Sequence, residues 1–230
     1  MRSKYQVVFL ALLAVGLLTV PIAAFAGSCT ADSMWLTLTD NSGDPMLQAG
    51  SNTGLVILTG SIGQWQINNV TGEGQGVLSL PDLLDLNSIN TVLTATGQHT
   101  LTITLVETGL TSPIGNFTTS SSIGGTATGT LTFVTEIIGG PGNTTTTLAS
   151  LSGLHGFPFS GHQLGFGAFQ TSPVQGNTYT LEEIVTIAQN VAGNNSFDAD
   201  LQIPEPATLS VLGAGLLALG TGLRKELLRG

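Results

Sequence analysis

"HTLTITLVET", residues 99–108, carries the clearest fold signal in this chain of 230 residues. Aliphatic side chains at positions 101, 103 and 105 alternate with threonines at positions 100, 102 and 104. Successive side chains of a strand point to opposite faces of the sheet, so this period of two predicts a strand with one aliphatic face and one hydroxyl face. Threonine and β-branched aliphatic residues also favour strands.

Similar segments occur along the rest of the chain. Five of them are expected to be strands: 34–39, 54–60, 62–68, 129–138 and 177–190. Joints rich in Gly and Asn, such as 71–76 and 139–143, separate them. Only "PDLLDL" (81–86) could form a helical turn, and no segment suits the helix of a βαβ crossover. The sequence therefore predicts an all-β fold, a single antiparallel β-sandwich of jelly-roll or immunoglobulin-like type.

Residues 1–26 have the features of a secretory signal peptide. A basic start (Arg2, Lys4) precedes an apolar core at 7–20, and alanines stand at the −3 and −1 positions before Gly27. The apolar core is shorter than the roughly 20 residues that a membrane-spanning helix needs. We therefore expect an exported chain that begins near Gly27, the alternative being an uncleaved anchor helix.

The C-terminal residues 204–230 predict a membrane anchor. Residues 207–223 carry no charge and reach about the length of a transmembrane helix, which Pro204 and Pro206 cannot extend backwards. Three basic residues form the membrane stop: Arg224, Lys225 and Arg229. Because basic residues remain on the cytoplasmic side, the helix is expected to run from outside to inside.

This C-terminal segment resembles the PEP-CTERM sorting tail of Gram-negative bacterial surface proteins. The resemblance rests on Pro204-Glu205-Pro206, the short apolar span and Arg224-Lys225, although Glu226 interrupts the basic cluster. It implies recognition of Pro204, Glu205 and Pro206 by an exosortase, a membrane-embedded transpeptidase. A transient inner-membrane anchor and delivery to the cell surface or extracellular matrix would follow. The tail is sometimes called the C-terminal domain of an ice-binding protein, a name that would describe sorting rather than ice.

The stretch from 27 to 203 is the expected folded domain, and its charge is one-sided. It contains twelve of the fourteen carboxylates and none of the five Lys and Arg residues. Nucleic acid is excluded as a partner, because binding its phosphates requires cationic side chains. Cys29 is the only cysteine, so an intramolecular disulfide is also excluded.

Motifs of common enzyme classes are absent from the sequence. There is no Gly-x-Ser-x-Gly, no His-Glu-x-x-His and no phosphate-binding loop with lysine. His155 and His162 have a spacing that no common zinc motif uses. The sequence therefore predicts no catalytic activity, although folding could still pair Glu182 or Glu183 with a distant aspartate.

Calcium is the cofactor that the sequence leaves open. "DNSGD" (40–44) and "NNSFDAD" (194–200) group hard oxygen donors on expected loops, and calcium binds six to eight such oxygens. The candidate ligands are Asp40, Asp44, Asp198 and Asp200. The alternative is that these residues form turns through hydrogen bonds to their own backbone.

Aromatic residues are the candidate platforms for an extracellular polysaccharide. They are Trp35, Trp65, Tyr179, Phe157, Phe159, Phe166 and Phe169, and the alternative for each is a place in the core. Thr-x-Thr runs such as 126–132 lack the fixed period that an ice-binding surface would require. We expect an exported structural or adhesive protein, the alternative being a carbohydrate- or calcium-binding module on the same sorting route.

Overall fold

Ten strands make up the described part of the chain. The computed structural model describes residues 33–75, 77–78, 82–110, 115–139, 144–169 and 178–202. The strands are β1 (Ser33–Asp40), β2 (Leu47–Ser51), β3 (Leu55–Ile62), β4 (Trp65–Glu73), β5 (Asp82–Leu93), β6 (His99–Leu110), β7 (Gly115–Gly139), β8 (Thr144–Phe169), β9 (Tyr179–Gln189) and β10 (Gly193–Gln202). None of these ranges contains a helix that is long and apolar enough to cross a membrane.

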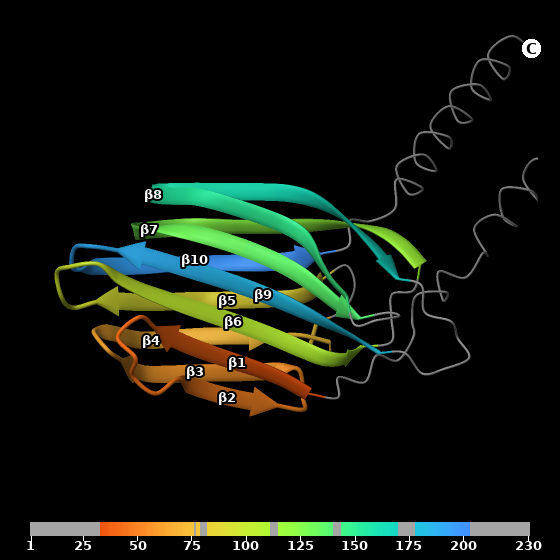
Figure 1. Cartoon of the computed structure of the whole chain (residues 1–230), viewed down its shortest axis with the longest axis horizontal. Helices are drawn as coiled ribbons and strands as arrows, with labels where there is room; N and C mark the ends of the chain where they lie inside the picture. Colours follow the sequence, from red (N-terminus) through yellow and green to blue (C-terminus); the bar gives the residue numbers. More distant parts are fainter. Residues whose placement is uncertain are drawn as a thin grey trace, which may run out of the picture.

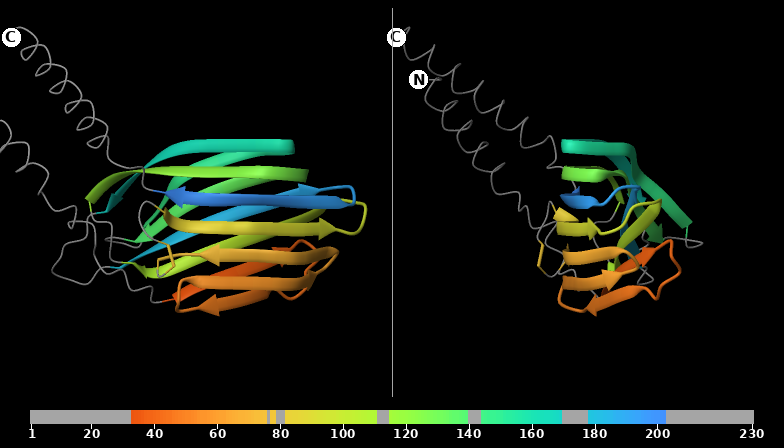
Figure 2. Two further views of the ribbon diagram at one scale, coloured as in Figure 1. Left: turned by 180° about the vertical axis from the view of Figure 1, so that it is seen from behind. Right: turned by 90° about the vertical axis from the view of Figure 1, so that its left-hand side faces the viewer.

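One antiparallel sheet folds over on itself into two packed layers (Figures 1 and 2). Its strand order is β2-β1-β6-β9-β7-β10-β5-β4-β3, and β8 pairs with β7. We call β2, β1, β6 and β9 the front layer, and β10, β5, β4 and β3 the back layer. The end strands β2 and β3 approach each other, so the two layers enclose one core. The predicted all-β, antiparallel architecture is confirmed.

The long hairpin of β7 and β8 joins the two layers. Residues 120–127 of β7 pair with β10 in the back layer, whereas residues 130–139 pair with β9 in the front layer. β8 follows β7 through both layers. The hydrogen-bonded sheet is therefore continuous, unlike the two separate sheets of the expected jelly-roll or immunoglobulin-like sandwich.

Asn195 stabilises the point at which β7 changes layer. The backbone N–H groups of Thr128 and Gly129 lie between the two pairings, and both donate to Asn195 Oδ1 at 3.1 Å. Asn195 Nδ2 donates in turn to Gln189 Oε1 at 2.9 Å. The buried amide thus supplies the acceptor that a neighbouring strand would otherwise provide.

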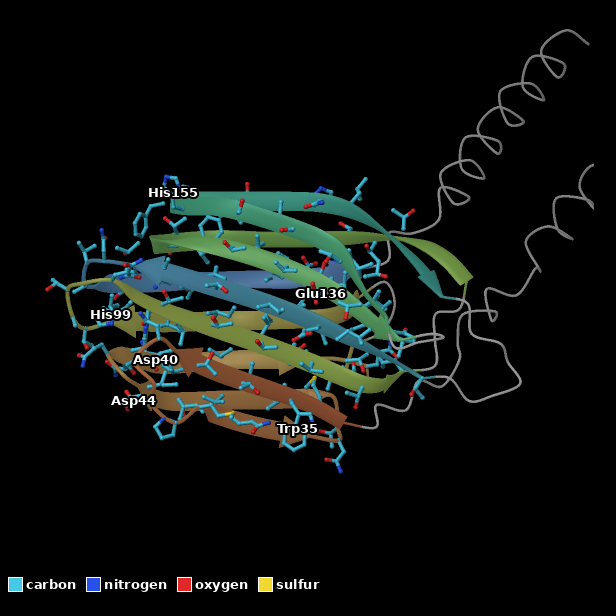
Figure 3. All side chains as sticks on the ribbon, viewed as in Figure 1. Trp35, Asp40, Asp44, His99, Glu136 and His155 are labelled. Atoms are coloured by element: carbon cyan, nitrogen blue, oxygen red, sulfur yellow. The ribbon has the colours of Figure 1, made fainter. Side chains whose placement is uncertain are left out.

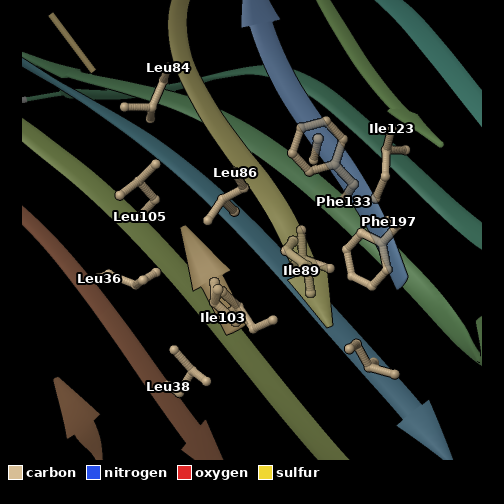
Figure 4. Close-up of a cluster of buried hydrophobic side chains, with 14 of the residues drawn as sticks. Leu36, Leu38, Leu84, Leu86, Ile89, Ile103, Leu105, Ile123, Phe133 and Phe197 are labelled. Carbon is tan, nitrogen blue, oxygen red and sulfur yellow. The ribbon is translucent and has the colours of Figure 1, made fainter. Parts of the chain in front are cut away.

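Alternate side chains of the strands fill the core (Figure 4). In β6, Leu101, Ile103 and Leu105 are fully buried, while the intervening threonines are half-buried, as the sequence predicts. Core side chains from both layers include Leu36, Leu38, Leu84, Leu86, Ile89, Ile123, Phe133 and Phe197. Each fully buried aliphatic side chain contributes about 1.5–3 kcal/mol, so this alternation is the main source of stability.

Two expectations about local structure are wrong. The helical turn that the sequence allowed at 81–86 is not formed over the described residues 82–86, because these belong to β5, which pairs with both β4 and β10. Residues 194–200 are not a loop but part of β10. In both cases pairing on two sides outweighs the local sequence preference.

The targeting segments fall outside the described residues. This applies to the expected signal peptide at 1–26, to the Pro204-Glu205-Pro206 motif and to the expected helix at 207–223. The membrane stop of Arg224, Lys225 and Arg229 lies outside them as well. These assignments stay predictions.

Candidate functional site

Trp35 points outward from β1 on the front layer, and 45% of its surface is exposed (Figure 3). Gly50 stands opposite it on β2. A Cβ atom at Gly50 would lie 2.5 Å from the indole Cζ3, so the ring lies against bare backbone. The fold thereby holds a large aromatic surface in a defined position while leaving nearly half of it to solvent.

The register of the strands places a row of side chains beside Trp35. The row continues from Trp35 with one residue on each neighbouring strand: Val106 on β6, Glu182 on β9, Glu136 on β7 and Thr147 on β8. Neighbouring strands are about 4.8 Å apart, so Glu182 lies about 10 Å from Trp35 along the row. Thr147 Oγ1 donates to Glu136 Oε1 at 3.1 Å.

Hydroxyl groups occupy the neighbouring rows of the same layer. One row consists of Thr39, Thr102, Thr186, Thr132 and Ser152, one residue from each of five adjacent strands. Thr37 and Thr104 lie in the row between it and Trp35. We call these residues and the Trp35 row together the Trp35 face. Each hydroxyl can both donate and accept a hydrogen bond.

Two carboxylates face each other on this surface. Glu136 and Glu182 are directly opposite in register. Partial burial raises the pKa of Glu182 above its ordinary value, and the charge of Glu136 raises it further. Like charges in directly opposed positions repel, which favours a ligand that donates hydrogen bonds to them.

Two further glutamates lie inside the fold. Burial raises the pKa of Glu107 to about 7, although its Oε2 accepts a hydrogen bond from the Gln75 N–H at 3.1 Å. Glu183 is fully buried, and burial followed by the charges of Asp85 and Asp200 raises its pKa well above the ordinary range. Glu182 and Glu183 point to opposite faces of β9, and of the two it is Glu183 whose charge interacts with aspartates distant in the sequence.

The four candidate calcium ligands lie in two separate places. Asp40 ends β1 and Asp44 follows in the next loop, whereas Asp198 and Asp200 lie on β10 in the back layer. Figure 3 shows Asp40 and Asp44 beyond the other end of β1 from Trp35. Within the described ranges, no group of three or more His, Cys, Asp or Glu side chains is arranged to hold a metal ion.

Three of these aspartates have partners within the fold. Asp198 Oδ1 accepts a hydrogen bond from the Ser88 N–H at 2.6 Å, and Asp200 Oδ1 accepts one from Ser122 Oγ. Asp44 Oδ2 accepts from Ser42 Oγ at 2.8 Å, as expected of a turn. Both carboxylate oxygens of Asp40 are shielded from solvent and lack a hydrogen-bond partner in the described part of the chain.

The candidate aromatic platforms divide between the core and the surface. Trp65, Tyr179 and Phe159 are buried, whereas Trp35 and Phe157 are exposed. The side chains of Phe166 and Phe169 are outside the described set. The histidines make local hydrogen bonds, His162 with Ser120 Oγ and His155 with the Gly153 carbonyl, each at 2.8 Å. Sequence reasoning missed Glu136 and Gly50, because only strand register places them beside Glu182 and Trp35.

No protein-family model and no curated protein matches this chain. Among solved structures, one described in work on the promiscuous specificity of carbohydrate-binding modules from the β-sandwich superfamily matches at 10% identity. The match covers 77% of this chain and 75% of that chain, with a TM-score of 0.34. The N-terminal cellulose-binding domain of Cellulomonas fimi β-1,4-glucanase C matches at 13% identity over 52% and 90% of the two chains, with a TM-score of 0.29. A Stig cyclase from Fischerella sp. TAU matches at 13% identity over 66% and 86%, with a TM-score of 0.28. These TM-scores are low, and they assign neither a family nor a ligand.

Proposed function

We propose that this chain is an exported, non-catalytic surface protein whose folded domain adheres to neutral polysaccharide through the Trp35 face. The half-exposed indole of Trp35, seated on Gly50, carries the proposal. The other tryptophan, Trp65, is buried in the core with 1% of its surface exposed. The core can therefore accommodate a tryptophan, and lack of space in the core does not explain why Trp35 is exposed. A flat aromatic ring can stack on the C–H face of a sugar ring.

The groups around Trp35 complement a sugar chain. The threonine row offers donors and acceptors, and Glu136 and Glu182 offer acceptors to sugar hydroxyls. The rows run across the strands, so a linear glycan could lie along them and meet the ring and the polar groups in succession.

The charge of the domain favours a neutral glycan over an anionic one. Residues 27–203 contain twelve carboxylates and no Lys or Arg. A uronate or sulfated chain would meet repulsion from this surface with no cation to offset it. The proposed ligand class is therefore a neutral polysaccharide of the extracellular matrix.

Affinity electrophoresis tests this binding. The full chain is run through native gels containing hydroxyethylcellulose or dextran, with alginate as the anionic comparison. We expect retardation in a neutral gel, and Trp35→Ala should weaken it about tenfold or more, in the range of an aromatic stacking contact. Ile57→Ala is the matched control, because Ile57 is an exposed apolar residue on β3 of the back layer. Equal retardation of both variants would remove the Trp35 face from the proposal.

The sorting route is proposed on the C-terminal motif. Pro204, Glu205 and Pro206 would be recognised by an exosortase-like transpeptidase, after a transient stay in the inner membrane. Intact mass and fractionation of the protein from its host test this route. Loss of residues beyond the motif, with the product on the surface or in the matrix, is expected. A chain that keeps its C-terminus in the inner membrane would mean that the tail is a permanent anchor.

A further inference from the structure

β8 is a long edge strand. It spans 26 residues and forms the rim of both layers in Figures 1 and 2, and among the described residues it pairs only with β7. The end strands on the other side are shorter, with five residues in β2 and eight in β3, and they approach each other. An edge strand exposes backbone N–H and C=O groups that can pair with another strand.

The edge along β8 carries no charge. Between Glu136 and Glu182 the sequence contains no Asp, Glu, Lys or Arg. Natural sheets commonly protect their edges with charged side chains, and this strand has none. Pro158 interrupts it near the middle, which leaves residues 144–157 and residues 159–169 as two stretches.

The second stretch is the better docking edge. In the first stretch, the backbone N–H of Ser150 already donates to the side chain of Gln163 at 2.9 Å. In the second, Ser160, His162 and Leu164 are exposed, and Leu164 exposes 55% of its surface. An exposed leucine beside an uncharged edge favours association.

We propose that residues 159–169 of β8 pair edge to edge, in antiparallel orientation, with the same residues of a second copy of this chain. The distribution of charge on the domain is the reason for choosing a second copy as the partner and the β8 edge as the contact. Two copies of a domain with twelve carboxylates and no Lys or Arg repel each other wherever carboxylates meet. The β8 edge is a surface on which a two-fold axis opposes no charges, and a two-fold interface is self-complementary.

The geometry of such a pair has a consequence for adhesion. A two-fold axis that joins antiparallel edges runs perpendicular to the sheet, so the front layers of both copies point in the same direction. The two Trp35 faces would then engage one polysaccharide together, which increases the apparent affinity without a new contact to sugar. This consequence rests on the proposed function, whereas the pairing itself does not.

Sedimentation of the full chain in mild detergent, without polysaccharide, tests the pairing. A concentration-dependent dimer is expected, and Leu164→Glu should weaken dimerisation at least tenfold by opposing carboxylates across the axis. Ser160→Glu is a second variant on the same edge. Ile57→Glu is the matched control, because Ile57 is 57% exposed on β3, and it should leave the dimer intact. A dimer that withstands both β8 variants would overturn the proposal.

Single-cysteine cross-linking locates the contact. In a Cys29→Ser background, Ser160→Cys, His162→Cys and Leu164→Cys are oxidised in turn, and the position nearest the two-fold axis should form disulfide-linked dimers. Ser196→Cys, exposed on β10 away from the edge, should not. If the variants form no disulfide-linked dimer and the β8 cysteines instead contact the chain's own terminal residues, the edge is covered by those residues and not by a second copy. Because these assays contain no sugar, they can fail while polysaccharide binding by Trp35 succeeds.

Discussion

At Glu107 the fold holds a carboxyl group that is stable mainly in its neutral form. Its Oε1 has no hydrogen-bond partner among the described residues, and burial raises the pKa of the carboxyl group from 4.5 to about 7. Because the folded-state pKa lies above the unfolded value, the folded state binds the proton more tightly. Protonation of Glu107 therefore stabilises the folded state by about 3 kcal/mol. This contribution is fully present below about pH 4.5 and is lost as the pH rises through about 7.

Glu107→Gln should therefore flatten the pH dependence of stability. Glutamine keeps an acceptor for the Gln75 N–H but never ionises, so the variant should be more stable than the parent at pH 8 and similar at pH 4.5. Urea unfolding at both pH values measures the difference, which we expect to reach about 2–3 kcal/mol. If the free energy of unfolding of the two proteins changed with pH in the same way, the ionisation of Glu107 would not be coupled to folding.

A substitution at Gly50 tests the position of the Trp35 indole without removing the indole itself. A methyl group at this position would lie 2.5 Å from the indole Cζ3 of Trp35, so Gly50→Ala should displace the ring. We expect faster quenching of tryptophan emission by acrylamide, with buried Trp65 as the internal reference, and weaker binding to neutral polysaccharide. Unchanged quenching would mean that the indole is not seated on Gly50.

At the scale of elements, β7 is the segment on which the two layers depend. It leaves β10 after Ala127 and joins β9 from Thr130, so two backbone N–H groups have no strand partner at the crossing. Asn195 accepts both of them. A buried N–H without an acceptor costs about 1–3 kcal/mol, so one amide side chain stabilises the connection between layers.

Asn195→Ala should destabilise the protein by about 2–4 kcal/mol, because it leaves two N–H groups and Gln189 Oε1 without their partner. Asn194→Ala is the matched control on the same strand, since the exposed Asn194 contributes its backbone carbonyl and not its side chain to Thr128. Denaturant unfolding at one pH compares the two variants. Equal losses of stability would contradict the role given to Asn195.

At the scale of the whole molecule, uncompensated negative charge opposes the compact state. The chain between residues 27 and 203 has twelve carboxylates and no Lys or Arg, so added salt screens repulsion and breaks no Lys or Arg ion pair there. Raising sodium chloride from about 0.02 M to about 0.2 M shortens the Debye length from about 20 Å to about 7 Å.

Thermal unfolding should therefore shift to higher temperature over that range, and self-association should strengthen in parallel. Calcium chloride at equal ionic strength separates general screening from a specific cation site, and Asp40→Asn tests the unpartnered carboxylate in the first candidate loop. A fall in Tm with sodium chloride would contradict the repulsion argument.

Sequence patterns of short range were sufficient for much of the fold. The strand at 99–108 follows from a period of two, and the buried aliphatic side chains of β6 agree with it. The absence of Lys and Arg between 27 and 203 follows from composition alone. Local pattern was insufficient at 81–86 and 194–200, where β5 and β10 are strands because partners on both sides satisfy their backbone groups.

The candidate site depended on contacts between residues that are far apart in the chain. Trp35 and Trp65 both lie in apolar strand patterns, and only packing exposes the first and buries the second. The pairing of Glu136 with Glu182, and the support of Trp35 by Gly50, come from strand register. Side-chain alternation is a local property, whereas the choice of partner strand is set by the burial of the whole core, which no short segment contains.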